Sequence, residues 1–247
     1  MPKAPRVVVT GANGAVGAAL ARIFKKNRYQ VILMAHDRTA IDALADDIGA
    51  HAVRIDVGDP ASVEAAFMAA GPVDVLINSA TISRPGPLMQ TDVRVWEEHL
   101  RVNLTGAFLC SLKVLPGMIS RRRGRIINLA GLAGALIFPG LAAYDASTAG
   151  IVGLTRSLAA EVSEHGIRVN ALRPGTADAP VSASLEEAIE PRADEDVEDL
   201  VADLLELSGQ PAPVDAERIA AAVFALATDP GADINGQILD LDDQRLA

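Results

Sequence analysis

Three glycines stand in a short segment that follows the first run of β-branched residues. The segment Thr10–Gly17 reads TGANGAVG and leads into an Ala/Leu-rich stretch with helical spacing. Glycines between a strand and a helix let backbone amides approach a pyrophosphate, and the positive end of the helix favours its negative charge. A tight turn can need glycine for its own geometry, but the place in the first strand–turn–helix unit favours nucleotide binding. The cofactor contacts expected in this turn are Gly11, Asn13, Gly14, Val16 and Gly17.

Asp37 is the acidic residue whose spacing fits the ribose of such a nucleotide. It lies 20 residues beyond Gly17. A carboxylate at this spacing can accept a hydrogen bond from a ribose 2′-hydroxyl, which favours NAD. An ordinary polar turn after the second strand is the alternative interpretation.

The elements that must position these residues alternate along the chain. Short β-branched runs, apolar on both faces, alternate with longer stretches of helical spacing, which indicates a parallel sheet covered by helices on both sides. The expected strands are Arg6–Thr10, Gln30–Ala35, Ala52–Ile55, Val73–Asn78, Arg125–Ala130, Arg168–Leu172 and Gln237–Leu241. The expected helices are Val16–Asn27, Ala40–Ile48, Pro60–Ala70, Asp92–Ser120, Tyr144–Glu164, Leu185–Leu207 and Ala216–Ala227. The fold class is therefore α/β, with a doubly wound, seven-stranded parallel sheet.

The chain has 247 residues and no composition break, so we expect a single domain over residues 1–247. Its net charge of −10 is concentrated in one place. Ten acidic residues lie between Val181 and Gln210, where only Arg192 opposes them. This segment, at about 176–214, follows the sixth strand, and an insertion there lies beside the ligand crevice of an open α/β sheet. We expect an acidic lid over the crevice; a solvated pair of surface helices is the alternative.

The composition excludes several classes of protein. The acidic charge disfavours nucleic acid or an anionic membrane surface as the main partner. The single cysteine, Cys110, excludes an intramolecular disulfide and a multi-cysteine zinc site. The four histidines have no spacing typical of a metal site, and the first residues contain no long apolar run of a signal peptide. We expect a cytoplasmic protein with no metal and no membrane partner.

Several motifs together resemble the short-chain dehydrogenase/reductase (SDR) family over essentially the whole chain. Thr10–Gly17 resembles the family's TGxxxGxG turn. The other motifs, in order, are Ile55-Asp56-Val57, Val102-Asn103, Gly124–Asn128, Tyr144, Arg168-Val169-Asn170, Pro174-Gly175 and Asn235-Gly236-Gln237. The resemblance implies a Rossmann fold, an NAD(P)(H) cofactor, a small-molecule substrate and assembly as a homodimer or homotetramer.

The resemblance also assigns cofactor contacts, with departures from the family pattern. It places Asp56 and Val57 at the adenine, and Pro174 and Gly175 beside the nicotinamide. The family's Asn-Asn-Ala-Gly motif is half retained, in Asn78 and Ala80. We expect dinucleotide affinity to be weakened, because the middle glycine of the turn is replaced by Ala15.

The choice between NAD and NADP stays open. Ala35 stands where the resemblance places the NAD-selective acid, and His36 stands where a phosphate-binding arginine often lies. Arg38 could hold a 2′-phosphate, which Asp37 would repel. These residues favour NADP slightly.

Of the four catalytic residues that the resemblance implies, this sequence has two. In the family a tyrosine donates the proton and a lysine four residues later lowers its pKa. A serine thirteen residues before the tyrosine orients the substrate oxygen, and a helix asparagine holds a water. Tyr144 and Asn103 are present, but Thr148 stands at the lysine position and Gly131 at the serine position. Each of these residues also has a structural interpretation. Tyr144 and Thr148 would then pack within their helix, and Asn103 would brace its helix against the neighbouring strands.

The sequence therefore predicts an NAD(P)(H)-binding enzyme of small-molecule metabolism that acts by an atypical route. The route is either a noncanonical redox step or a non-redox conversion such as cyclisation, dehydration or isomerisation. Tyr144 would act as a neutral hydrogen-bond donor and Asn103 would position a water. The acidic segment would favour neutral or cationic substrates. The alternative is a non-catalytic binding protein or partner subunit with the same fold.

Overall fold

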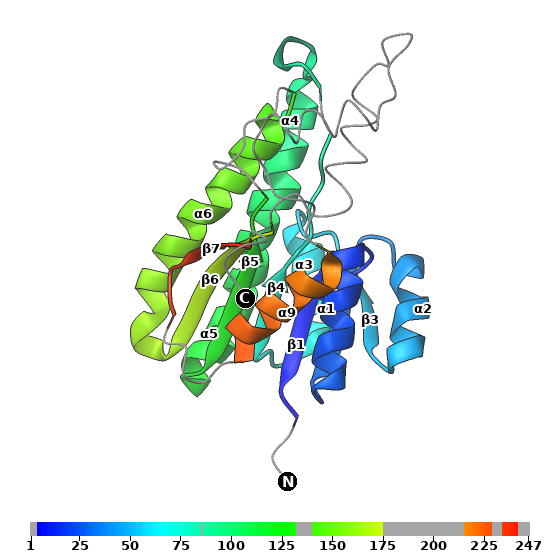
Figure 1. Cartoon of the computed structure of the whole chain (residues 1–247), viewed down its shortest axis with the longest axis vertical. Coiled ribbons are helices and arrows are strands. Elements are labelled where there is room, and N and C mark those ends of the chain that lie inside the picture. Colours follow the sequence, from blue (N-terminus) through cyan, green and yellow to red (C-terminus); the bar gives the residue numbers. More distant parts are fainter. Residues whose placement is uncertain (1–3, 85, 132–139, 175–214, 229–233, 242–247) are drawn as a thin grey trace.

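The computed structural model describes residues 4–84, 86–131, 140–174, 215–228 and 234–241. Within them, seven parallel strands form one sheet in the order β3-β2-β1-β4-β5-β6-β7 (Figure 1). The strands are β1 (Arg6–Thr10), β2 (Gln30–Ala35), β3 (His51–Arg54), β4 (Val75–Asn78), β5 (Gly124–Leu129), β6 (Ile167–Arg173) and β7 (Ile238–Asp240). The order reverses between β1 and β4, where ligands bind in doubly wound sheets. The predicted fold class is confirmed.

Helices follow the strands, as the alternating pattern predicts. They are α1 (Ala15–Lys26), α2 (Thr39–Ile48), α3 (Pro60–Ala70), α4 (Val93–His99), α5 (Gly106–Arg121), α6 (Ala142–Val162) and α9 (Ala216–Thr228). Short helical turns are η1 (Leu88–Gln90), η2 (Leu100–Thr105) and η3 (Ser163–His165). Predicted and observed boundaries differ by at most two residues, and those of β1, β2 and α3 coincide. The expected helix Leu185–Leu207, the acidic segment at 176–214 and Gly175 lie outside the described residues.

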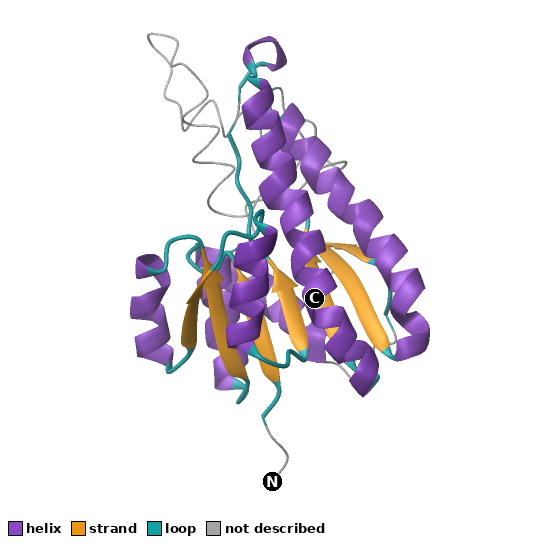
Figure 2. Cartoon of the chain, turned by 180° about the vertical axis from the view of Figure 1, so that it is seen from behind, coloured by secondary structure: helices purple, strands orange, loops and turns teal. Residues whose placement is uncertain are grey.

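Both faces of the sheet are buried, because side chains alternate along each strand. Val7 and Val9 of β1 pack under α1, α2 and α9, whereas Val8 packs on the other side under α3, α5 and α6. Figures 1 and 2 show these two helical layers from opposite sides. Aliphatic side chains dominate both clusters. Helices on both faces explain why the strands are apolar throughout rather than alternating.

A long helical stretch rises beyond the sheet beside α6 (Figures 1 and 2). It runs from Val93 to Arg121 through α4, η2 and α5, where the sequence predicted one helix over Asp92–Ser120. The difference is that η2 is a turn of π-helix, a feature that is frequent at functional sites. By length and composition alone this stretch could cross a membrane. However, α5 packs on β4, β5 and α3, so a core helix accounts for its apolar character.

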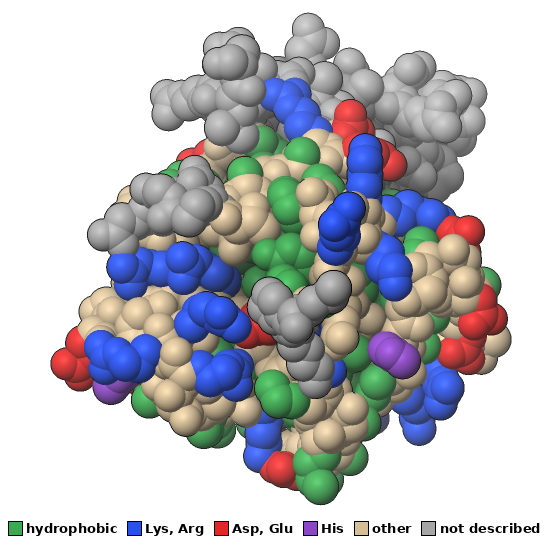
Figure 3. Space-filling model, turned by 90° about the horizontal axis from the view of Figure 1, so that it is seen from below, with side chains coloured by type: hydrophobic (Ala, Val, Ile, Leu, Met, Phe, Trp, Pro, Cys, Tyr) green, Lys and Arg blue, Asp and Glu red, His purple; other side chains and the backbone are tan. Residues whose placement is uncertain are grey.

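Lys and Arg side chains gather on the face seen in Figure 3, at the amino edge of the sheet. Helices of a parallel α/β fold end at this edge, and cations favour the negative ends of helix dipoles. Lys25 and Lys26 lie in the last turn of α1, and Arg121 lies in the last turn of α5. Arg121 also donates to the Val73 carbonyl oxygen at 2.7 Å. The basic residues here stabilise the chain's own backbone.

Candidate nucleotide and active site

Two glycines, one in the turn between β1 and α1 and one in the first turn of α1, are required by the fold itself. Gly11 has φ +66°, and a Cβ there would lie 2.7 Å from the Ala80 Cα. A Cβ on Gly17 would lie 2.7 Å from the Ala12 Cα. At Gly14, by contrast, the nearest atom to such a Cβ is the Gly11 carbonyl oxygen, 3.8 Å away. Gly11 and Gly17 therefore let the turn pack, while Gly14 leaves open space above it.

Backbone donors face this open space at the start of α1. The first helical hydrogen bond runs from the Ala18 amide to the Gly14 carbonyl at 2.9 Å, and no side chain caps the helix. The amides of residues 15–17 are therefore left over by the helix, as at any helix start. Asn13, Gly14 and Ala15 are exposed. Open space and unused amides together fit a pyrophosphate, although the exposed Ala15 methyl narrows its approach.

Thr10 connects this turn by hydrogen bonds to the residues that follow β4. It is 1% exposed, and its hydroxyl oxygen accepts hydrogen bonds from the amides of Ser79 (3.1 Å) and Ala80 (3.2 Å). The same hydroxyl donates to the Ile77 carbonyl at 3.4 Å. Sequence reasoning missed this role. The signal was a threonine at the end of an otherwise apolar strand.

The side chain of Asn78, an expected cofactor contact, is buried and hydrogen-bonded within the protein. Its amide nitrogen donates to the Asn128 side-chain oxygen at 2.8 Å, and Asn128 donates in turn to the Thr155 hydroxyl at 2.9 Å. This buried chain ties β4 to β5 and α6. The Asn78 side-chain oxygen is buried without a partner in the described residues. Sequence reasoning did not find these contacts of Asn128 and Thr155.

Charged residues cluster where the ribose of a nucleotide is expected. Asp37 accepts a hydrogen bond from the Thr39 amide at 2.9 Å and so holds the start of α2. Arg38 pairs with Asp42 at 3.3 Å. Arg54, which sequence reasoning missed, ends β3 and donates to the His36 carbonyl at 3.2 Å. Asp37, Arg38 and Arg54 are all exposed.

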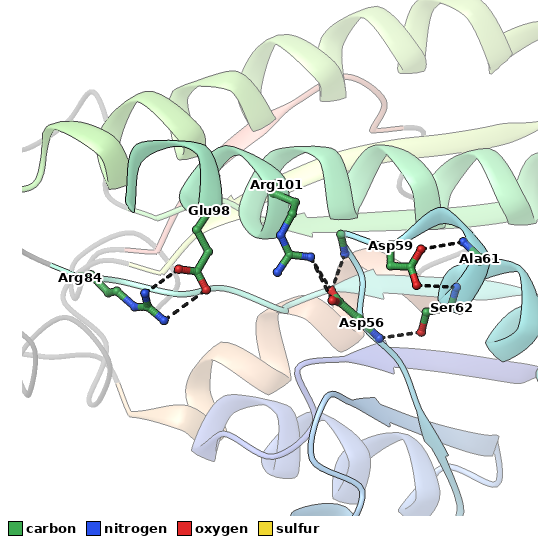
Figure 4. Close-up of polar contacts among 8 residues, drawn as sticks. Asp56, Asp59, Ala61, Ser62, Arg84, Glu98 and Arg101 are labelled. Atoms are coloured by element: carbon green, nitrogen blue, oxygen red, sulfur yellow. Dashed lines mark hydrogen bonds and ion pairs between the residues drawn. The ribbon is translucent and has the colours of Figure 1, made fainter. Parts of the chain in front are cut away.

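Asp56 lies just past β3 and is held by an arginine from the long helix (Figure 4). Nη1 of Arg101 donates to Oδ1 at 2.8 Å and to Oδ2 at 3.0 Å, and the Gly58 amide donates to Oδ1 at 3.0 Å. Burial acts to raise the pKa of Asp56, but the hydrogen bonds from Arg101 and Gly58 outweigh it and lower the pKa overall. Val57 beside it is buried against Gly106 of α5. Arg101 had no sequence signal.

Tyr144 and Gly131 do come together, as their predicted roles require. A Cβ on Gly131 would lie 2.7 Å from the Tyr144 Cζ and closer still to the hydroxyl oxygen. The phenol therefore fills the space that a side chain at position 131 would occupy. Tyr144 is 7% exposed, and burial together with the Asp145 charge raises its pKa to about 12. The hydroxyl stays neutral at physiological pH.

Thr148 and Asn103 are engaged by the protein itself. The Thr148 hydroxyl donates back to the Tyr144 carbonyl at 3.1 Å, one helical turn earlier. Asn103, in η2, accepts from the Ile82 amide at 2.8 Å and donates to the Ile82 carbonyl at 3.0 Å and the Ser147 hydroxyl at 2.9 Å. Both amide hydrogens of Asn103 are used, so only one oxygen lone pair is left to accept from a water. These contacts match the bracing role.

Two further residues that the sequence singled out are Cys110 and Pro174. Cys110 is buried, and burial raises its thiol pKa to about 12, which makes it unreactive at neutral pH. Pro174 directly follows β6 and is half-buried. Across the described ranges, no three His, Cys, Asp or Glu side chains lie together as a metal site would need.

Comparison with known proteins identifies the family. The model of the short chain dehydrogenase family matches residues 5–190. Oxidoreductase UcpA of Salmonella typhimurium (strain LT2) is 34% identical over 239 residues, which cover 93% of this chain and 89% of that protein. A protein of Xanthobacter autotrophicus called inactive 2-(S)-hydroxypropyl-CoM dehydrogenase 2 is 41% identical over 163 residues, covering 64% and 71%.

The solved structures agree. A short chain dehydrogenase/reductase family protein superposes with a TM-score of 0.83 at 29% identity, over 96% of this chain and 95% of that one. The superposition supports the fold of the seven-stranded parallel sheet described above, and the family model matches the part of the chain that contains its first six strands. The chain belongs to the short-chain dehydrogenase/reductase family.

Proposed function

We propose that this protein is an SDR-type enzyme that binds NAD(P)(H) but does not use the tyrosine–lysine–serine proton relay. One observation carries the proposal: the neutral Tyr144 phenol fills the place of the missing side chain at Gly131. Thr148, at the lysine position, is 3% exposed and bonded to helix carbonyl oxygens. It brings no positive charge to the phenol.

The cost of ionising Tyr144 supports a neutral donor. Its pKa rises from 10.0 to about 12, and each unit corresponds to roughly 1.4 kcal/mol, so burial and the Asp145 charge together disfavour the phenolate by about 3 kcal/mol. At pH 7 the phenolate fraction is on the order of one in 10⁵. Tyr144 can thus hydrogen-bond and polarise a substrate oxygen, while the transferred proton comes from water or from the substrate. A redox step with that proton source and a non-redox conversion are both compatible with this role.

The cofactor would occupy the crevice at the carboxyl ends of β1 and β4. The free amides of residues 15–17 would hold the pyrophosphate above Gly14, Asp56 would hold the adenine, and Pro174 would border the nicotinamide. When bound, the nicotinamide supplies or accepts a hydride. Arg38 and Arg54 near Asp37 favour NADP slightly. The Ala15 methyl would weaken the affinity.

A pair of substitutions tests the proposed loss of the relay. Gly131→Ser with Thr148→Lys supplies the missing hydroxyl and charge, and the lysine lowers the pKa of the phenol. The serine Cβ crowds the Tyr144 ring, so circular dichroism first checks that the double variant is folded. We expect wild-type protein to leave NADPH unoxidised with a panel of ketones at pH 7, and the double variant to oxidise it. Ketone reduction by the wild type at the rate of the double variant would contradict the proposal, because the absence of the serine and the lysine would then not have disabled the relay.

The proposal includes assembly as a homodimer or homotetramer. Phe108 and Leu112 of α5 are 46% and 48% exposed, and Ile119 shares their helix face. An exposed apolar face of this kind favours association, here with a second copy of the chain. We expect Phe108→Glu with Leu112→Glu to lower the mass measured by sedimentation. Met68→Glu, an equally polar change at an exposed residue of α3, serves as the control. A monomeric wild type would overturn this part.

The remaining parts of the proposal are a neutral or cationic small-molecule substrate and a cytoplasmic location. The expected substrate charge rests on the acidic segment at 176–214 and on the charge of the whole chain. The expected substrate charge follows from repulsion between that segment and anions. Neither nucleic acid nor a membrane is part of the proposed function.

A second candidate is a non-catalytic member of the family. The internal engagement of Asn103 and Thr148 favours it, and one relative is itself called inactive. The two candidates differ in one measurement. Tyr144→Phe should abolish product formation in the enzyme, whereas a binding protein would form no product in either version while still binding NADPH.

A further inference from the structure

Arg101 is hydrogen-bonded to the carboxylate of Asp56, which the proposed function assigns to the adenine. Its Nη1 bridges both oxygens of Asp56, and the ion pair is partly open to solvent, with the side chains 42% and 30% exposed (Figure 4). The two residues are 45 positions apart in the sequence. The contact therefore joins the turn after β3 to the π-helical turn η2.

Gly58 makes room for this contact. A Cβ on Gly58 would lie 2.6 Å from Cγ and 2.9 Å from Cζ of Arg101, and closer still to Nη1. Any other residue at position 58 would push the arginine away from Asp56. The arrangement thus depends on two residues, the arginine and the glycine beneath it.

Counting lone pairs shows what is left for a ligand. Each carboxylate oxygen can accept about two hydrogen bonds. Oδ1 of Asp56 already accepts from Arg101 and from the Gly58 amide, and Oδ2 accepts from Arg101. Only one position, on Oδ2, remains, and the arginine side chain lies beside it. An amino group approaching Asp56 must share the carboxylate with Arg101 or displace it.

We infer that Arg101 acts as a latch at the base end of the nucleotide site. It closes on Asp56 when the site is empty and opens when an adenine nucleotide binds, so it lowers the affinity for the adenine half. This inference rests on the proposed function. A partly exposed ion pair contributes up to about 1 kcal/mol, which corresponds to a change in Kd of about fivefold.

The test measures Kd by calorimetry for ADP-ribose and for nicotinamide mononucleotide, which lacks adenine. We expect Arg101→Gln to tighten ADP-ribose binding about three- to fivefold and to leave the mononucleotide unchanged. Arg84→Gln is the matched control, because Arg84 forms a similar ion pair with Glu98 and the same charge is lost away from Asp56. Gly58→Ala should tighten ADP-ribose binding in the same way with Arg101 still present.

The outcomes are separable. If Arg101→Gln binds ADP-ribose no more tightly than Arg84→Gln does, or more weakly, Arg101 is not a latch. If Arg101→Gln tightens the binding of ADP-ribose and of the mononucleotide equally, the effect comes from general charge loss and the inference is wrong. If neither the wild type nor any variant binds ADP-ribose at millimolar concentration, the proposed function itself fails, and the latch fails with it.

Discussion

Replacing Gly131 with alanine should destabilise the fold, because the phenol of Tyr144 fills the space that the new methyl group needs. The Cβ would lie 2.7 Å from Cζ and 2.8 Å from Cε1 of the ring. Tyr144 is only 7% exposed, so the ring cannot move away without disturbing its neighbours. Overpacking of this kind costs about 1–3 kcal/mol, and we expect about 2 kcal/mol for Gly131→Ala.

Urea unfolding measures this cost, and a double-mutant cycle assigns it to the phenol. In a Tyr144→Ala background, Gly131→Ala should cost less than about 0.5 kcal/mol, because the ring is gone. Gly153→Ala in α6 is the control: apart from the adjacent residues and backbone of its own helix, no atom of the described residues lies within 4 Å of its Cβ, so helix propensity should make it neutral or stabilising. An unchanged urea midpoint for Gly131→Ala, or an equal cost in both backgrounds, would refute the reasoning.

Three further predictions follow from the same contacts. Because the pKa of Tyr144 is raised, its contribution to stability should be complete below pH 10 and lost as the pH rises toward 12; urea unfolding across that range should show a steeper loss for wild type than for Tyr144→Phe. Thr10→Val should cost about 1–3 kcal/mol and weaken NADPH binding, since two backbone amides lose their acceptor; an unaltered melting temperature would contradict this. Asn128→Leu should cost a similar amount by removing the acceptor of one Asn78 side-chain N–H and the donor to the Thr155 hydroxyl, as thermal unfolding would show, and a variant as stable as wild type would disprove it.

The fold was predictable because its signals are local. Apolar β-branched runs, the glycine turn and the helical spacing each act over a few residues, and together they define the α/β alternation. The π-helical turn at Leu100–Thr105 was not predictable, because no residue type marks where a helix gains one extra residue per turn. Strand ends shifted by one or two residues because pairing with neighbouring strands, rather than composition, sets where each strand stops.

The candidate site was predictable only in part. The family motifs located Gly131, Tyr144 and Thr148, but not the fact that the phenol fills the space above the glycine. The Arg101–Asp56 pair joins residues 45 positions apart, and nothing in either local sequence announces it. Contacts of this kind depend on how two elements pack, so they emerge only once the chain is folded.

Calorimetric titration of the wild-type protein with NADPH tests the central claim most directly. The amides of residues 15–17 and the open space above Gly14 predict saturable binding at one site per chain, weakened by the Ala15 methyl. The same titration with NADH shows whether Arg38 and Arg54 favour the phosphorylated cofactor. The account predicts measurable heat for both cofactors, with NADPH the tighter. No binding of either cofactor at millimolar concentration would contradict it.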